Sequence, residues 1–215
     1  MLIRHIGHAE FYLETESGVR IVTDPYDAGC GFPVKNPTAE IVLVSHGHHD
    51  HNAVENVFGN PSVIREAGVY TPMPDVKITA IRSYHDAMRG AQRGETLLFL
   101  IETENLRIVH MGDAGCIPDE DQLRKLKKPD ILMIPVGGFY TIDGATARKV
   151  ADRLGAGIIL PMHYRTKYNP DWPITGPEEF LNGYEETEVM RDAEALRVTD
   201  GDKGCHSRVV LFRQG

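Results

Sequence analysis

Four histidines and one aspartate lie within six consecutive positions of the segment Ser45-His46-Gly47-His48-His49-Asp50-His51. The segment directly follows residues 41–44, a short apolar run that is typical of a buried strand. Neutral imidazole nitrogens and ionised carboxylates are good ligands for zinc, manganese and iron. Local histidine-rich segments indicate metal binding more often than a solubilising loop. The segment therefore predicts a metal site at the end of a strand.

The spacing within this segment leaves the ligand pairs open. Residues two apart point the same way in an extended chain but not on a helix. His46 and His48 can therefore converge on one ion, while Asp50 and His51 can hold a second. By spacing alone, His49 and His51 form an equally good pair.

Three more candidate ligands each follow a strand-like run. His85 follows residues 80–84, Asp113 follows residues 106–109, and His163 follows residues 158–160. Taken singly, a histidine at a strand end is more often a hydrogen-bonding residue than a ligand. Because loops converge at one edge of a sheet, the joint occurrence of these residues favours a shared site.

The elements that must position these residues can be read from the periodicity of apolar side chains. Strands are predicted at residues 3–6, 10–14, 19–23, 41–44, 76–81, 96–102, 107–109, 131–136, 158–160 and 208–213, with hairpin turns at 16–18 and 103–105. Helices are predicted at residues 119–128 and around Ala147, Val150, Ala151 and Leu154, ending at Gly155. A β-rich first half followed by alternating helices and strands predicts a layered α/β (α+β) fold.

Two long segments are predicted to lack strands and helices. They cover residues 24–37 and residues 165–177, and the second contains Trp172, the only tryptophan. Long loops of this kind are often lids or binding elements, and a plain surface excursion is an equally good interpretation.

Length and composition fit one domain spanning residues 1–215, with 41% hydrophobic residues. The net charge of −8 argues against non-specific nucleic-acid binding. No segment approaches the roughly 18 apolar residues of a membrane helix, and the first residues lack the apolar stretch of a signal peptide, so we expect a cytoplasmic protein. Cys30, Cys116 and Cys205 are expected to be free thiols. A homo-oligomer is left open.

The pattern His46-x-His48-x-Asp50-His51 resembles the signature of the metallo-β-lactamase superfamily. His85, Asp113 and His163 match the later metal-binding motifs of that family in order. The resemblance covers nearly the whole chain, from Gly7-His8-Ala9-Glu10-Phe11 through residues 23–25 to Pro161-Met162-His163-Tyr164. Residues 136–141 and 161–164 look closest to a compact branch of metal-dependent hydrolases. That branch includes ascorbate-6-phosphate lactonase-like proteins and relatives of the phospholipase that cleaves N-acylphosphatidylethanolamine.

The resemblance implies a four-layer αββα sandwich with its site at one edge of two sheets. It also implies two divalent metal ions, with zinc preferred and manganese or iron as alternatives. One ion would be held by His46, His48 and His85, the other by Asp50, His51 and His163, and Asp113 would bridge the two. His49 falls at a variable position. The true β-lactamases commonly have a cysteine in place of Asp113, which speaks against β-lactam hydrolysis here.

The implied activity is that of a dinuclear metal-dependent hydrolase, in which a metal-bridging hydroxide cleaves a small ester, lactone or phosphodiester. Two divalent ions, Asp50, Asp113 and a hydroxide leave about one net positive charge, which favours an anionic small-molecule substrate. Asp50 is the candidate catalytic residue for moving the proton. The alternatives are an iron-dependent oxidoreductase of the same fold and a non-catalytic metal-binding protein.

Further residues are predicted to support the metal ligands or to contact the substrate: His8, Asp24, His110, Tyr140, Tyr164 and Arg165. Asp24 is expected to orient a metal-binding histidine through the other ring nitrogen. His110 is expected to support the site rather than to bind metal. For His8, a role at the site and a structural role are equally good interpretations. The remaining three are proposed as substrate contacts because they lie near Gly137-Gly138 and His163 in the sequence.

Overall fold

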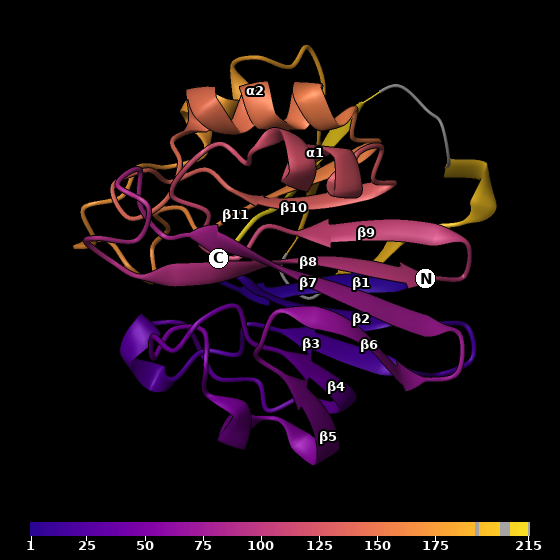
Figure 1. Cartoon of the computed structure of the whole chain (residues 1–215). Coiled ribbons are helices and arrows are strands. Elements are labelled where there is room, and N and C mark those ends of the chain that lie inside the picture. Colours follow the sequence, from indigo (N-terminus) through magenta and orange to yellow (C-terminus); the bar gives the residue numbers. More distant parts are fainter. Residues whose placement is uncertain (192–193, 203–206, 215) are drawn as a thin grey trace.

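The strands of the computed structural model form two sheets that pack face to face (Figure 1). The model describes residues 1–191, 194–202 and 207–214, so Cys205 lies outside the described residues. The smaller sheet contains β1 (Leu2–Gly7), β2 (Glu10–Glu14), β3 (Arg20–Thr23), β4 (Thr38–Leu43), β5 (Phe58–Ile64) and β13 (Leu196–Arg197). The larger sheet contains β6 (Gly68–Met73), β7 (Val76–Tyr84), β8 (Glu95–Thr103), β9 (Leu106–His110), β10 (Ile131–Pro135), β11 (Ile158–Met162), β12 (Thr187–Met190) and β14 (Arg208–Phe212).

The strand orders are β13-β1-β2-β3-β4-β5 in the smaller sheet and β12-β14-β11-β10-β9-β8-β7-β6 in the larger sheet. The main core lies between the two sheets. Phe11 and Leu13 from β2 meet Phe99 and Ile101 from β8 in this core, and all four side chains are fully buried. Because residues two apart in a strand share a face, each strand contributes alternate side chains to it.

Helices cover the outer face of the larger sheet, above β9, β10 and β11 (Figure 1). They are α1 (Glu120–Leu126), α2 (Gly144–Leu154) and the short α3 (Glu178–Leu181). Val150 and Leu154 of α2 pack with Leu132 and Ile134 of β10 in a second core. No helix in the described part of the chain is long and apolar enough to cross a membrane.

The outer face of the smaller sheet carries a thinner layer. Val54 and Val57, in and next to a 3-10 turn at Val54–Asn56, pack against Val22 and Val42. Within the described ranges, this face has no α-helix. The predicted α/β sandwich is confirmed, with this outer layer reduced to a single turn. All strands and both helices predicted from the sequence are present, with ends shifted by a few residues.

Glu10 is a buried carboxyl group in the smaller sheet. Its side chain accepts a hydrogen bond from the backbone N–H of Tyr26 at 3.5 Å. Burial raises the pKa of Glu10 to about 8, because the hydrogen bond from Tyr26 offsets only part of the cost of burying a charge. At neutral pH Glu10 is therefore mostly protonated in the folded protein and ionised in the unfolded chain.

Replacing this carboxyl by the neutral amide of Glu10→Gln tests the assignment. Because the folded-state pKa is raised, the stability that Glu10 contributes is fully present below about pH 4.5 and is lost as the pH rises through about 8. Relative to the parent protein, Glu10→Gln should therefore gain stability between about pH 5 and about pH 9, by a few kcal/mol. Urea denaturation in the presence of a chelator measures this difference. Glu16→Gln, in the exposed turn before β3, is the control, and a parent–variant difference independent of pH would contradict the assignment.

Candidate metal centre

The carboxyl ends of six strands meet at one edge of the sandwich. β1, β3 and β4 run in the same direction, because β2 is antiparallel to β1 and β3, and β3 is parallel to β4. In the other sheet β7, β9 and β11 share a direction for the same reason. The residues that follow these ends are His8, Asp24, Ser45–His51, His85, Asp113 and His163. Strand direction thus brings together residues from position 8 to position 163.

Asp113 lies at the centre of this edge, and its side chain is 2% exposed. Its Oδ2 atom lies 3.2 Å from Nε2 of His51, 3.2 Å from Nε2 of His85 and 3.2 Å from Nε2 of His163. Nε2 of His46 lies 3.8 Å away. Four imidazoles from three loops therefore point the same ring nitrogen at one carboxylate oxygen.

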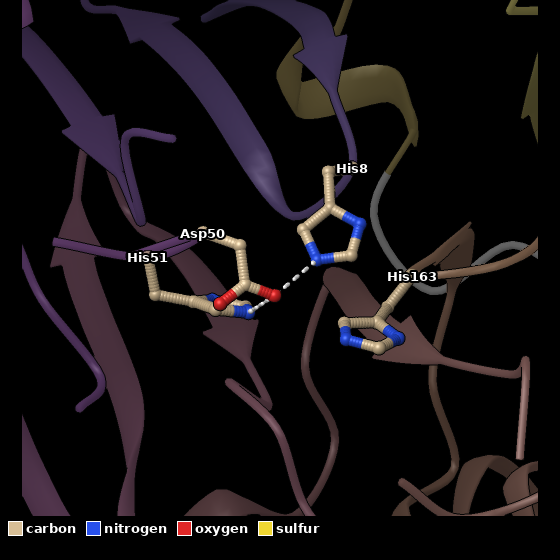
Figure 2. A group of neighbouring side chains, drawn as sticks. All are labelled: His8, Asp50, His51 and His163. Atoms are coloured by element: carbon tan, nitrogen blue, oxygen red, sulfur yellow. Dashed lines mark hydrogen bonds and ion pairs between the residues drawn. The ribbon is translucent and has the colours of Figure 1, made fainter. Parts of the chain in front are cut away.

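The potential ligand atoms fall into groups whose members all lie within 4.8 Å of one another. One group is His46, His48 and His85, and a second is His8, Asp50, His51 and His163. Figure 2 shows the second group, with His8 and His51 directed at the carboxylate of Asp50. A third group joins His46 and His51 to Asp113 and so connects the other two. The structure thus brings together all seven predicted ligands and adds His8.

In two of these imidazole rings, Nδ1 faces away from Asp113, and its hydrogen-bond partner indicates that the arrangement suits cations. Nδ1 of His51 faces the Asp24 carboxylate at 3.0 Å, and Nδ1 of His85 faces the carbonyl oxygen of Tyr140 at 3.1 Å. Both partners are acceptors, so we assign the proton to Nδ1 in each ring. The Nε2 lone pairs then face Asp113, which is repulsive unless a cation lies there. Consistently, Nε2 of His51 and Oδ1 of Asp113 are buried without a hydrogen-bond partner in the described structure.

Asp24 fixes the start of the histidine-rich segment. Its Oδ1 accepts the backbone N–H of Ser45 at 2.7 Å, and its Oδ2 accepts the Ser45 hydroxyl at 2.7 Å. The same Oδ2 contacts Nδ1 of His51, and Oγ of Ser45 lies 2.9 Å from Nδ1 of His46. One fully buried carboxylate thus orients one histidine directly and another through Ser45. The contact predicted between Asp24 and a metal-binding histidine is present.

Left-handed backbone conformations turn the chain sharply at these strand ends. His8 (φ 52°), Asp24 (φ 41°) and His163 (φ 52°) adopt positive φ, which is uncommon outside glycine. Gly112 (φ 47°) does the same, and a Cβ there would lie 2.6 Å from the carbonyl oxygen of Leu97. Such residues persist only where their surroundings hold them, and they concentrate at functional sites.

Hydrogen bonds from both sheets hold His8. Its carbonyl oxygen accepts the backbone N–H of His163 at 3.1 Å and contacts Nε2 of His5 at 2.9 Å. Its own Nε2 lies 3.2 Å from Oδ2 of Asp50. His8 therefore links the β1–β2 turn to the end of β11 and reaches the second group of ligand atoms.

The carboxylates at the centre are held ionised. Burial alone would raise the pKa of Asp113, but the adjacent His163 and His51 outweigh it and hold that pKa well below its usual range. Burial acts the same way on Asp50, and there His51 and His8 lower the pKa further than burial raises it. Both side chains are thus available as anionic ligands.

The pKa values of the imidazoles are shifted in opposite directions. Burial lowers the pKa of His46 to about 3 and of His8 to about 4, so both rings are neutral at pH 7. For His51, burial also lowers the pKa, but the carboxylates of Asp113 and Asp50 outweigh it and hold the pKa well above its usual value. A positive charge is therefore favoured beside His51, as a proton or as a metal ion. Neutral imidazole is the form that binds metal.

Three of the other predicted residues do not join the centre. His110 uses Nδ1 to accept the backbone N–H of Gly112 and contacts the carbonyl oxygen of Ala9 through Nε2, so it supports the Gly-Asp turn. Tyr164 is buried in the core beneath the helices, and its hydroxyl donates to the carbonyl oxygen of Phe212. Tyr164 therefore cannot reach a substrate at this edge, contrary to the sequence prediction, and exposed Arg165 does not line the cavity either.

A cavity of about 540 Å³ opens over the centre. His48, Asp50, His85, Asp113 and His163 form its floor and walls, together with Tyr140, Arg93, Trp172, His49 and Gly29. His49 pairs with Asp27 at 3.0 Å, is 59% exposed, and belongs to none of the ligand groups, as expected for a variable position. Tyr140, which was predicted to contact the substrate, lines this cavity.

Sequence reasoning did not assign three residues of this cavity to the site, namely Gly29, Arg93 and Trp172. Arg93 lies in a polar loop with no neighbouring motif to single it out. Trp172 was noted as the only tryptophan, in a loop for which a binding element and a plain surface excursion were equally good interpretations, but it was not assigned to the site. That loop and residues 24–37 share a small apolar cluster in which Trp172 and Tyr168 pack with Tyr26, Cys30 and Phe32.

Comparisons with known proteins agree with this geometry. Residues 2–163 match the family model of the β-lactamase superfamily domain. A UPF0173 metal-dependent hydrolase of Thermococcus onnurineus is 30% identical, covering 91% of this chain and 99% of the relative. A similarly named protein of Archaeoglobus fulgidus is 26% identical, covering 100% of this chain and 97% of the relative.

A solved structure indicates the same family. It is a proposed Zn-dependent hydrolase of the metallo-β-lactamase superfamily from Thermotoga maritima, 34% identical to this chain. The match covers 99% of both chains with a TM-score of 0.81. By the extent of these similarities, this chain belongs to the metallo-β-lactamase superfamily and to its metal-dependent hydrolases.

Proposed function

We propose that this chain is a dinuclear metal-dependent hydrolase that cleaves a small anionic ester, lactone or phosphodiester. The observation that carries the proposal is the convergence of two groups of ligand atoms on the Asp113 carboxylate. The names of the relatives, metal-dependent hydrolases, support the reaction class. The organisation as one domain over residues 1–215 and the cytoplasmic location stay predictions from the sequence.

The donor atoms suit two divalent ions. His46, His48 and His85 would hold one ion, and Asp50, His51 and His163 the other, with Asp113 between them. We propose zinc as the preferred metal because imidazole and carboxylate donors suit it, with manganese and iron as alternatives. Such ions lower the pKa of a bound water toward neutrality and polarise the bond to be cleaved. His8 belongs to the same group of ligand atoms and would bind the second ion or support its ligands.

Asp50 is placed to handle the proton. Its Oδ2 lies 3.2 Å from Nε2 of His8 and 3.5 Å from Nε2 of His51, and its side chain is 13% exposed at the cavity. The pKa of Asp50 is held below its usual range, so the side chain is ionised at neutral pH and its oxygen has no proton of its own. With His8 beside it, Asp50 Oδ2 can take the proton of the attacking water and return it to the leaving group.

The charge of the centre favours an anion as substrate. Two divalent ions balanced by Asp50, Asp113 and one hydroxide leave about one positive charge, as the residue types alone indicated. The structure supports this proposal, because Asp50 and Asp113 are the only carboxylates among the residues that line the cavity in the described chain.

Metal content and substrate class test the proposal directly. We expect purified protein to contain about two zinc ions per chain by elemental analysis. We also expect it to hydrolyse at least one of a chromogenic phosphodiester, a lactone and a thioester, and to lose that activity when a chelator removes the metal. Bound iron accompanied by oxygen consumption, without hydrolysis, would identify an oxidoreductase instead.

Asp50→Asn tests the proton-handling role. The amide cannot accept the proton, so kcat should fall by at least about a hundredfold. The rate is measured at saturating metal, with the metal content of each sample determined in parallel, so that loss of a ligand is separated from loss of the base. Full metal occupancy with an unchanged kcat would remove Asp50 from this role.

A matched pair of variants tests the positioning of His51. Asp24→Asn removes the charge that holds Nδ1 of His51, and metal affinity should fall by about ten- to a hundredfold. Asp27→Asn removes the equivalent partner of the exposed His49 and should leave metal affinity unchanged. Competition with a chromogenic chelator measures both. An equal response of the two variants would show that Asp24 has no special role.

A further inference from the structure

The loop between β7 and β8 is organised by one carboxylate. Asp86 follows His85 and is 3% exposed. Its Oδ1 accepts the backbone N–H groups of Met88 and Gly90, and its Oδ2 accepts those of Gln92 and Arg93, at 2.8 to 3.0 Å. Four hydrogen bonds to one side chain fix the path of this loop relative to His85. The backbone of Arg93 is therefore held in place beside a proposed metal ligand.

The side chain of Arg93 is half-buried and lines the cavity over the centre. Its guanidinium carbon lies 5.7 Å from the ring centre of Phe139 and 5.5 Å from that of Tyr140. Phe139 has φ 57°, a genuine outlier for a bulky residue, and the residue is 61% exposed. A residue keeps such a conformation only where its surroundings hold it, and residues of this kind concentrate at functional sites. Here it places an exposed ring against the guanidinium.

Arg93 has no carboxylate partner among the described ion pairs. Six other arginines each have at least one, namely Arg20, Arg82, Arg107, Arg124, Arg153 and Arg208. Of the lining residues in the described chain, Arg93 is the only arginine or lysine. Stacking against two rings restricts the guanidinium and leaves its N–H groups free to bind an oxyanion through two bonds. A guanidinium that has no carboxylate partner and is held in this way in a cavity is well placed to bind an anion.

The other wall of the cavity is aromatic. Trp172 lies 6.2 Å from Tyr140 and 5.3 Å from His8, measured between ring centres. It is anchored in the apolar cluster that joins residues 24–37 to residues 165–177. A ligand in the cavity therefore meets the metal centre, one cation and one indole ring.

We propose that Arg93 binds a second anionic group of the substrate, a carboxylate or a phosphate, distinct from the group that is cleaved. The inference rests on the proposed hydrolase function and narrows its substrate class to small esters, lactones or phosphodiesters that carry a further oxyanion. Tyr140 and Phe139 hold the guanidinium, and Asp86 holds the loop that presents it.

Binding of three probes of equal chain length tests this inference. Propylphosphonate carries one anionic group, whereas 3-phosphonopropionate adds a carboxylate and propane-1,3-bisphosphonate adds a second phosphonate. Because Trp172 is the only tryptophan and lines the cavity, its fluorescence reports occupancy in the metal-loaded protein without any turnover. A protein without hydrolase activity can thus still be tested, so failure of the function and failure of the inference are distinguishable.

In the parent protein, at least one of the two doubly anionic probes should bind about tenfold more tightly than propylphosphonate. Arg93→Gln should lose that preference while binding propylphosphonate within about twofold of the parent. Arg93→Lys, which keeps the charge without the planar fork, should retain part of the preference. Loss of preference for only the carboxylate probe or only the bisphosphonate probe identifies which second group Arg93 recognises.

Arg89→Gln is the matched control, because Arg89 is an exposed arginine of the same loop that does not line the cavity. It should leave the preference for the second anionic group unchanged. The inference is overturned if the parent shows no preference, if Arg93→Gln keeps it, if Arg93→Gln weakens propylphosphonate equally, or if Arg89→Gln has the same effect as Arg93→Gln.

Discussion

Asp113 places a negative charge in a nearly water-free position between the two sheets, with Nε2 atoms of four histidines directed at it. An uncompensated charge in such a place is costly, so the site favours a cation beside it. The histidines that would hold that cation come from both sheets, which requires β4, β7 and β11 to deliver their carboxyl ends to one edge. Strand direction and the left-handed corners at His8, Asp24 and His163 together place the side chains around this carboxylate.

Precision at the centre comes from groups that do not touch the ligand-facing nitrogens. Asp24 holds His51, Ser45 holds His46, and the Tyr140 carbonyl holds His85, each through the opposite ring nitrogen. These partners come from three separate segments of the chain. A ring fixed in this way keeps its lone pair aimed whether or not a cation is present, so little ordering is needed when a metal binds.

Dense local signals, namely β-branched runs and a histidine-rich segment, predicted the layered α/β fold and a cluster of polar residues at one sheet edge. The sandwich and the assignment of ligands to two ions came from the family resemblance. The strands that the sequence missed, β5, β6, β12 and β13, are the four edge strands of the two sheets. Edge strands tolerate proline and exposed polar residues, as Pro61 in β5 and Pro72 in β6 show, so their pattern is weak. Arg93 and Trp172 were missed for a different reason. Their meaning depends on neighbours distant in sequence. Tyr164 was misplaced because the left-handed corner at His163 ends the alternation of β11 and turns Tyr164 toward the helices.

The distance in sequence between His8 and His163 has a consequence for biosynthesis. When the histidine-rich segment has left the ribosome, His85, Asp113 and His163 have not, and the strand that precedes His163 is still more than a hundred residues away. The enclosed site forms only when β11 docks beside β10 and the His8 carbonyl accepts the His163 amide. Under the proposed function, tight metal retention would therefore be a late event that marks a chain whose two sheets have closed.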